Sequence, residues 1–385
     1  MSGRGKARAT RGDTAMTLEL GSNTDTGPDT YRFRTRDGLH SAGEFRTETL
    51  LALDACWEND LDDLLVAQAN YGVLGVVLAA RADGVTMTES SARAADTCRE
   101  NVRENGVEAA VELVARESEL DGTVDTAVYV PKPYTALEVG KQRITDLLGR
   151  LAPEGTLFVG ARETTGLNRY VDCLSELGAD PETVAGADGA TLVRASRPAT
   201  LDPPTYVERG TDTVHIDGTE LDLVSEPGLF AAGGLDDGTR LLAESATVDD
   251  GDRVLDLCCG CGPLGAYAGL TADCSVTLTD DDARATACAE ATLSANDLAG
   301  AVHTADGVGA VRDSTFDVVL SNPPTHAGSG VLADLFDGAA DVLAPDGRVA
   351  FVHHRELDLS PHLGRFGSVE RVATGPEHAI QVARR

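Results

Sequence analysis

The fold is decided by the stretch Val254-Leu-Asp256-Leu-Cys-Cys-Gly260-Cys-Gly262-Pro-Leu-Gly265, where a short apolar run leads into a glycine-rich turn and then an apolar, alanine-containing segment. An apolar strand followed at once by such a turn and a helix is typical of a parallel sheet with helices on both faces. Glycines let the backbone approach a ligand closely, and the N–H groups that begin the helix favour an anionic group. On its own, the G-x-G-x-x-G spacing also fits a nicotinamide-dependent dehydrogenase.

The same alternation of strands and helices continues around this stretch. The pattern predicts strands at 253–257, 275–279, 317–320 and 348–353, and helices at 264–270, 283–296 and 331–343. Two runs near the end, 369–374 and 379–383, flank Gly-Pro-Glu and predict a closing antiparallel hairpin. We therefore expect an α/β, Rossmann-like fold.

An internal repeat spans most of the chain. Residues 31–75 stay in register with residues 221–265 at an offset of 190, which becomes 191 and later 192 through single inserted residues. The Leu-Ala-Pro turn at 151–153, for example, faces the one at 343–345. Register held over this length with so few gaps indicates two tandem copies of one domain.

The repeat predicts four segments. We expect a disordered tail over 1–30, a first domain over 31–195, a linker leading into the second domain over 196–220, and the second domain over 221–385. The tail carries four basic residues among small polar ones, namely Arg4, Lys6, Arg8 and Arg11. An RNA-contacting arm is the alternative interpretation of this tail.

The charge balance is strongly acidic. With 63 acidic and 32 basic residues the net charge is −31, and lysine occurs only at Lys6, Lys132 and Lys141. Such a surface suits molar salt, where the Debye length is about 3 Å, so we expect a protein from a halophile. Acidity would ordinarily count against a nucleic-acid partner, but at molar salt that argument loses most of its force.

The distribution of apolar residues and cysteines indicates in which cellular compartment the protein works. No apolar run approaches the roughly 18 residues of a membrane span, and the first residues do not resemble a signal peptide. The eight cysteines lack the paired spacing of a zinc site. We expect a cytoplasmic monomer without membrane contact, with reduced thiols and no metal, in which Cys258, Cys259 and Cys261 are small residues lining the loop.

Two carboxylates near the glycine-rich turn indicate a particular ligand. Asp256 lies four residues before the first glycine, where it can take the ammonium of an amino-acid ligand such as S-adenosylmethionine (SAM). Asp280 ends the next strand, where it can accept both hydroxyls of a ribose. The alternative for Asp280 is a helix N-cap.

A third motif, Phe316-Asp-Val-Val-Leu-Ser-Asn322-Pro323-Pro324, covers the predicted strand 317–320 and the residues after it. This strand is the fourth when a third strand, expected just before Asp306, is counted. Together with the glycine-rich turn and Asp280, it resembles the class I SAM-dependent methyltransferases that methylate planar amino groups. The resemblance implies that SAM is the cofactor, held by Asp256, Gly260, Gly262, Asp280, Asp306 and Asn322, with Asp306 reaching the adenine amine. It also implies that the Asn322 side-chain oxygen and the Pro323 carbonyl accept the two N–H groups of the target amine.

The tandem layout narrows the resemblance. A degenerate first half, then Glu226-Pro-Gly-Leu-Phe230, then a half carrying Asn-Pro-Pro, is similar to the bacterial small-subunit rRNA guanine-N2 methyltransferases and their large-subunit relatives. In that family an aromatic residue after Asn-Pro-Pro stacks on the target base. Here that position is Thr325, so His326 or Phe230 is expected to replace it beside Pro324.

The first copy has lost its site. Val66, Asn70, Val130 and Lys132 stand opposite Asp256, Gly260, Asn322 and Pro324, and only Glu89 persists, opposite Asp280. We expect this copy to bind no SAM. Three basic residues near its old cleft, Lys132, Lys141 and Arg143, are candidate RNA contacts, the alternative being a solvated charge cluster.

We therefore expect a SAM-dependent methyltransferase that acts on an exocyclic amino group, with guanine N2 of ribosomal RNA or a small-subunit particle as substrate. Asn-Pro-Pro also serves adenine-N6 and protein-glutamine methylation. A rival from another class is a non-catalytic RNA-binding or ribosome-assembly protein, and a dehydrogenase is a distant third.

Overall fold

The computed structural model describes residues 15–24 and 26–385, which form two compact units that divide between Val207 and Glu208. The boundary falls within the linker expected over 196–220. The part up to Val207 is unit 1 and the part from Glu208 is unit 2.

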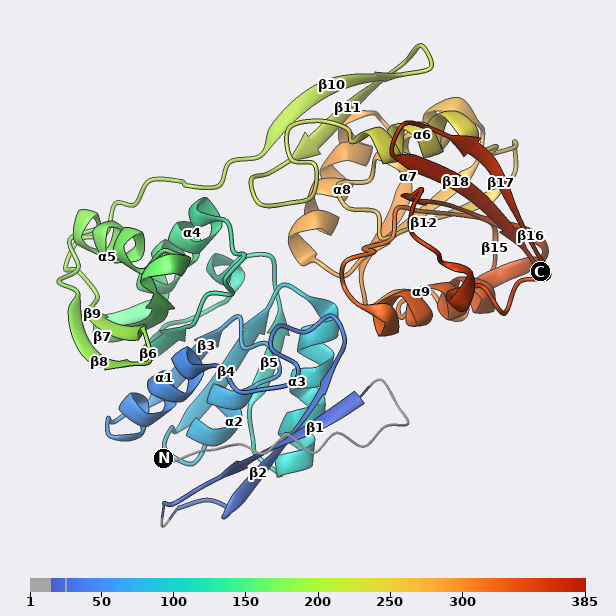
Figure 1. Cartoon of the computed structure of the whole chain (residues 1–385). Coiled ribbons are helices and arrows are strands. Elements are labelled where there is room, and N and C mark those ends of the chain that lie inside the picture. The colour runs from blue at the N-terminus through green and yellow to red at the C-terminus, as the bar shows by residue number, and fades with distance from the viewer. Residues whose placement is uncertain (1–14, 25) are drawn as a thin grey trace. The chain divides into compact units, whose positions relative to one another are not determined.

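Unit 2 is built on a seven-stranded sheet of order β14-β13-β12-β15-β16-β18-β17 (Figure 1). Its strands in chain order are β12 Arg253–Leu257, β13 Ser275–Asp280, β14 Gly300–Thr304, β15 Phe316–Ser321, β16 Leu343–His354, β17 Ser368–Thr374 and β18 His378–Arg384. The first five are parallel, and β18 pairs antiparallel with both β16 and β17. The predicted strands and closing hairpin are confirmed, and β14 is the third strand expected just before Asp306.

Helices cover both faces of this sheet. On one face lie α6 Asp237–Ser245, α7 Pro263–Thr271 and α8 Ala283–Ala295, and on the other lies α9 Ser329–Val342 with the short 3-10 turn Ser360–His362. Apolar strand residues alternate between the two resulting cores, so that Val254 packs with α7 and α8 while Leu255 packs with α9. The α/β fold expected from the sequence is confirmed.

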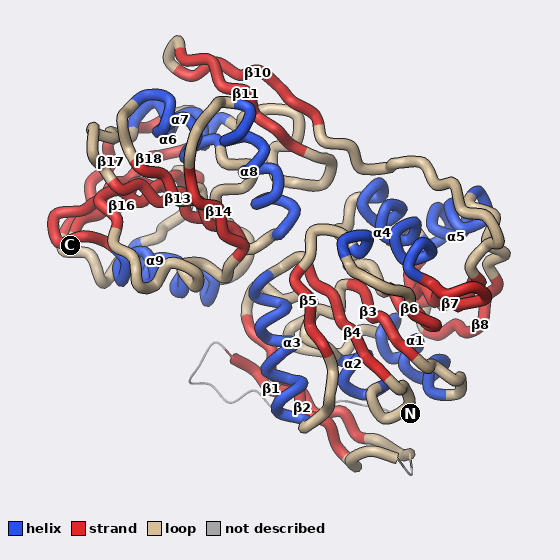
Figure 2. The backbone as a smooth tube through the Cα atoms, turned by 180° about the vertical axis from the view of Figure 1, so that it is seen from behind, coloured by secondary structure: helices blue, strands red, loops and turns tan. Residues whose placement is uncertain are grey.

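Unit 1 repeats this architecture with the order β5-β4-β3-β6-β7-β9-β8. Its sheet strands are β3 Asp63–Ala67, β4 Gly84–Glu89, β5 Ala110–Leu113, β6 Val124–Tyr129, β7 Leu151–Arg162, β8 Glu182–Ala187 and β9 Ala190–Ser196. The helices are α1 Thr47–Trp57, α2 Val73–Leu78 and α3 Ala92–Asn105 on one face, and α4 Leu137–Arg150 and α5 Leu167–Glu176 on the other. Figure 2 shows α3 alongside β4 and β5.

Each unit also carries a two-stranded hairpin, β1 Ala15–Gly21 with β2 Thr30–Arg36, and β10 Gly210–Ile216 with β11 Thr219–Ser225. One of the contacts by which the hairpins dock on α3 and α8 is repeated in both units: Asn105 binds both the N–H and the carbonyl of Arg32, and Asn296 binds those of Asp222.

Strand β1 lies inside the segment expected to be a disordered tail, and that expectation is wrong for it. Leu18 and Leu20 alternate with polar residues and are buried in the unit 1 core, which holds the strand in place. The four basic residues of the tail, on which the alternative of an RNA-contacting arm rests, lie outside the described residues. Among the helices of the described chain, none has both the length and the apolarity needed to cross a membrane.

Candidate functional site

The glycine-rich turn of unit 2 connects the end of β12 to the start of α7. Its residues at 258, 260 and 262 all have left-handed backbone conformation, with φ of 62° at Cys258, 55° at Gly260 and 83° at Gly262. A side chain at Gly262 would collide with Leu278 at 2.8 Å, whereas one at Gly260 would meet nothing within 4 Å. Gly262 is therefore required by packing, and Gly260 leaves space open above the turn.

Asp280, the last residue of β13, holds this turn in place. Its carboxylate accepts the N–H of Gly260 at 2.8 Å and that of Asp282 at 2.9 Å. Burial raises the pKa of Asp280 to about 6, although these backbone hydrogen bonds act in the other direction. The alternative role as a helix N-cap is wrong, because Asp282 caps α8 by accepting the N–H of Arg284.

Asp256 is the second carboxylate under the turn and is fully buried. Its Oδ2 accepts the N–H of Gly265 at 2.8 Å, while Oδ1 has no hydrogen-bond partner among the described residues. Burial raises the pKa of Asp256 to about 7, and the nearby Asp280 adds to the shift. An orphaned buried carboxylate oxygen of this kind fits a ligand that brings a cationic donor.

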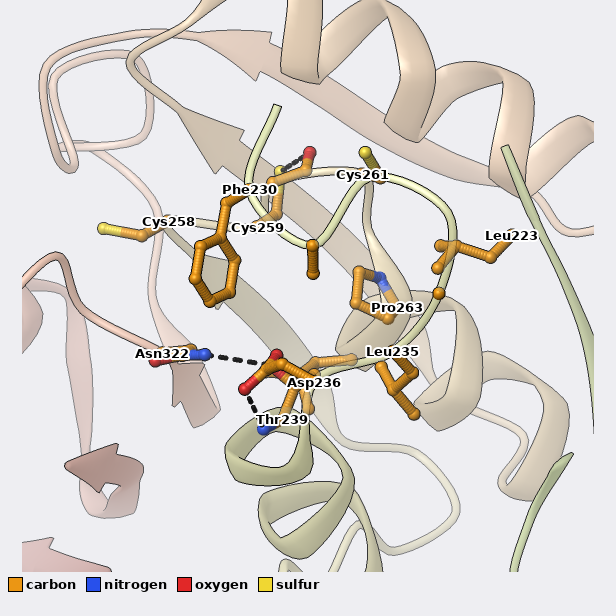
Figure 3. Close-up of a pocket in the computed structure, with 14 residues that line it drawn as sticks. Leu223, Phe230, Leu235, Asp236, Thr239, Cys258, Cys259, Cys261, Pro263 and Asn322 are labelled. Carbon is orange, nitrogen blue, oxygen red and sulfur yellow. Dashed lines mark hydrogen bonds between the residues drawn. The ribbon is translucent and has the colours of Figure 1, made fainter. Parts of the chain in front are cut away.

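A hollow of about 450 Å³ lies over the turn (Figure 3). Its lining combines the turn, the loop before α6, the start of α6 and the end of β15, through Leu223, Phe230, Ala231, Gly234, Leu235, Asp236, Thr239, Cys258, Cys259, Gly260, Cys261, Pro263, Leu264 and Asn322. The Phe230 ring is 68% exposed at the mouth of the hollow, and the three cysteines are lining residues as expected.

Asn322 is held by a residue that the sequence did not single out. Its Nδ2 donates to Thr239 Oγ1 at 2.9 Å, so that its carboxamide oxygen remains the acceptor. Thr239 is itself fixed at the start of α6, where Asp236 accepts the N–H groups of Gly238 and Thr239. The carbonyl of Pro323 accepts the N–H of Thr325 at 2.8 Å, which leaves it one further lone pair.

The loop that carries Phe230 is anchored by a buried ion pair. Arg284, near the start of α8, donates to Glu226 Oε1 at 2.6 Å and to the carbonyl of Pro227 at 2.6 Å. Both charged side chains are less than one-tenth exposed. Arg93, at the equivalent place in unit 1, donates to the carbonyl of Asp37. The repeated Ala-Arg pair was visible in the sequence, but its anchoring role was not.

The structure brings together most of the predicted site residues of unit 2. Asp256 and Asp280 lie under the turn that contains Gly260, and Phe230 and Asn322 line the hollow. Pro324, Thr325 and His326 follow on the loop toward α9 and are not among the lining residues, and Asp306 lies two residues beyond β14. Of the aromatic candidates, the hollow therefore receives Phe230.

Unit 1 keeps the shape of the turn with Asn70 in place of Gly260, while Gly72, with φ of 88°, is retained opposite Gly262. Gln68 and Asn70 stand at the equivalent positions with φ of 54° and 58°, and the N–H of Asn70 donates to Glu89 at 2.5 Å. The other oxygen of Glu89 is occupied by Lys132, whose Nζ lies 3.3 Å away. Since Val66 replaces the second carboxylate, the residues present do not fit a SAM-type ligand.

The proposed RNA-contacting trio of unit 1 needs correction. Arg143 is buried and paired with Glu117 at 2.5 Å, and Lys132 is paired with Glu89. These two cations neutralise buried carboxylates and are not surface groups for phosphate. Lys141 lies with its Nζ 5.3 Å from the centre of the Tyr206 ring.

Comparisons with known proteins agree with this geometry. The family model for the methyltransferase small domain matches residues 30–189 and again residues 220–381. Ribosomal RNA large subunit methyltransferase G of Pseudomonas putida (strain GB-1) is 32% identical over 337 residues, 84% of this chain and 87% of the relative. Ribosomal RNA small subunit methyltransferase C of Pseudomonas aeruginosa (strain UCBPP-PA14) is 33% identical over 269 residues, 67% and 78% respectively.

The fold has a solved counterpart in the 16S rRNA N2 methyltransferase of T. thermophilus in complex with AdoMet and guanosine. The TM-score is 0.77 over 92% of this chain and 95% of that chain, at 21% identity, so the likeness is one of fold.

We expect SAM to bind at one site per chain, because within residues 15–24 and 26–385 only unit 2 has two carboxylates under an open turn that no described cation neutralises. Calorimetry should give a stoichiometry near one, and Asp256→Asn should abolish most of the binding. The control is Glu89→Gln in unit 1, which should leave the affinity unchanged. A stoichiometry near two, or equal losses in both variants, would contradict the assignment.

The affinity for SAM should also depend on pH. The raised pKa values of Asp256 and Asp280 mean that both carboxyls hold protons at pH 5, and the cationic ligand has to displace them. Binding should therefore strengthen between about pH 5 and 7, by up to about tenfold per unit for each carboxyl, and level off above. Titration calorimetry in buffers of different ionisation enthalpy measures the released protons. The exposed Asp297→Asn variant should titrate like the wild type, and a flat profile in the wild type would refute the assignment.

Proposed function

The chain belongs to the methyltransferase small domain family and is a SAM-dependent methyltransferase, and from this premise we propose that its substrate is guanine N2 of ribosomal RNA. The observation that carries the proposal is the position of Asn322, with its carboxamide held beside the turn over Asp256 and Asp280. The relatives named for ribosomal RNA and the solved structure with guanosine support the same substrate.

We propose that Asp256 takes the ammonium of SAM and that Asp280 takes its ribose hydroxyls, with Gly260 leaving room for the ligand. Asp306 is the proposed partner of the adenine amine. When bound, SAM supplies a methyl group on a positively charged sulfur. The buried carboxylates favour a cationic ligand at this place.

The target nitrogen needs activation, because its lone pair is delocalised into the base. The Asn322 side-chain oxygen and the Pro323 carbonyl would accept its two N–H groups, draw it toward tetrahedral geometry and aim the lone pair at the methyl carbon. A nitrogen–carbon bond would form as the sulfur–carbon bond breaks, the electron pair of the broken bond would stay on the sulfur as a neutral thioether, and the amine would release one proton to water. The protein contributes positioning and fixed dipoles.

Phe230 is the proposed platform for the target base. Its ring stands at the mouth of the same hollow, while Thr325 occupies the position where the family carries an aromatic residue. The Glu226–Arg284 ion pair would hold this platform in place. Pro324 and His326 follow Asn322 closely enough in sequence to contact the substrate beyond the base. A cytoplasmic monomer acting on ribosomal RNA or a small-subunit particle is part of the proposal.

The substrate is tested by mass-spectrometric mapping of ribosomal RNA from a deletion strain. One guanine should lose its N2-methyl group and regain it on complementation with the wild-type gene. Loss of an adenine-N6 methyl group would replace the base assignment, and an unchanged modification map would refute the ribosomal substrate.

If Asn322 orients the amine, Asn322→Ala should lower the rate of methyl transfer by about 100-fold or more, because one positioned polar contact of the transition state is lost. SAM affinity should stay close to that of the wild type, since the carboxylates under the turn are untouched. Single-turnover kinetics and calorimetry measure the two effects separately. Unaltered turnover would show that Asn-Pro-Pro is merely a turn in this protein.

A further inference from the structure

Two aromatic rings are far more exposed than the other large apolar side chains of the described chain. Tyr134 is 69% exposed and Phe230 is 68% exposed, whereas the next most exposed one, Val372, reaches 44%. Phe230 stands at the hollow of unit 2, and Tyr134 follows β6 of unit 1, two residues after Lys132, which lines the equivalent hollow there. Phe230 thus lines its hollow and Tyr134 lies next to the corresponding one, and an aromatic face open to solvent is a surface on which a nucleic-acid base can stack.

The internal repeat relates the surroundings of the two rings. In the register of the two copies, His40 stands opposite Phe230 and Tyr134 stands opposite His326. Each unit therefore has one ring before its first helix and one after its fourth sheet strand. The exposed ring is the earlier one, Phe230, in unit 2 and the later one, Tyr134, in unit 1. In unit 1 the His40 and Tyr134 rings are 5.6 Å apart and nearly perpendicular.

The hollow of unit 1 persists although its cofactor position is filled. It measures about 440 Å³ and is lined by Arg46, Asn70, Val130 and Lys132, among others. Asn70 Nδ2 donates to the carbonyl of His40 at 2.7 Å, while its Oδ1 is buried without a hydrogen-bond partner in the described part of the chain. The hollow thus contains an unused acceptor, and the His40–Tyr134 ring pair adjoins it through the hydrogen bond from Asn70.

The lining of this hollow is more positively charged than that of the hollow in unit 2. Arg46 stands where unit 2 has Asp236, Val66 where it has Asp256, and Lys132 where it has Pro324. The two carboxylates nearby, Glu48 and Glu89, are paired with arginines and with Lys132. Burial and the charges of Arg46 and Lys132 lower the pKa of His40 to about 4, so its ring is neutral at pH 7.

We propose that the Tyr134 and His40 rings of unit 1 form a second, non-catalytic site that binds an unstacked base of the RNA substrate. This inference rests on the proposed function. The Tyr134 face would stack on the base, and Asn70 Oδ1 would accept one of its N–H groups. Every base has an aromatic face, so the site tolerates different sequences, and stacking of this kind changes affinity by roughly 5- to 150-fold per base.

The test uses the full chain and a fluorescent single-stranded RNA of about 12 nucleotides, a length in the range covered by single-strand binding sites. Tyr134→Ala should weaken RNA binding by about tenfold or more, and Tyr134→Phe should restore it, because the ring face is retained. The slope of binding against salt concentration should stay unchanged in Tyr134→Ala, since a neutral ring releases no counterions. Val184→Ala, at an exposed apolar residue of β8, is the matched control and should bind like the wild type.

Photo-crosslinking of the same RNA carrying 4-thiouridine should label the peptide that contains Tyr134 or the one that contains His40. Wild-type affinity in Tyr134→Ala, an equal loss in Tyr134→Phe, or a reduced salt slope would overturn the site. If the wild-type protein methylates ribosomal RNA while Tyr134→Ala binds RNA normally, only this inference fails. If the wild type does not methylate ribosomal RNA at all, it is the proposed function that fails.

Discussion

One hydrogen bond recurs at the same place in both units, and the rest of each site depends on it. The carboxylate that ends the second sheet strand accepts a backbone N–H of the turn after the first, from Gly260 to Asp280 and from Asn70 to Glu89. It holds the turn in a left-handed conformation that costs little with glycine and is tolerated with asparagine. In unit 1 the turn keeps its shape with Asn70 in place of Gly260, so this shape does not require that glycine. The shape of the turn is therefore independent of whether space for a ligand remains above it.

The two units differ in what happens to buried charge. In unit 2, Asp256 and Asp280 lie under the turn, and no cationic side chain of the described residues pairs with them. Burial raises the pKa of both carboxyls. Ionising them in the folded protein costs stability, which a cationic ligand can return. In unit 1, Lys132 neutralises Glu89 and a valine removes the other carboxylate. In unit 1 the Lys132–Glu89 ion pair thus stands where the corresponding carboxylate of unit 2 is left without a cation.

Much of the fold was predictable because it is encoded locally. Apolar runs and alanine-rich stretches gave the strands from Arg253 and Ser275 and the helix from Ala283 to within a residue or two, and the repeat gave two units. Side-chain partners were not predictable, because they come from distant elements. Arg143 looked like a surface cation until Glu117 was placed against it, and Thr239 lies 83 positions from Asn322, with which it shares a hydrogen bond. Phe230 could be selected over His326 only once the hollow was known.

The strong acidity of the chain bears on how it can recognise RNA. A protein with a net charge of −31 gains little from general attraction to phosphate, and two of the cations that looked available are spent on buried carboxylates. Stacking on an aromatic face involves no net charge, so neither self-repulsion nor salt screening weakens it much. An acidic RNA-modifying enzyme should therefore concentrate its recognition in exposed rings at well-formed hollows. Phe230 and Tyr134, the most exposed large apolar side chains of the described residues, are the proposed stacking surfaces, one in each unit.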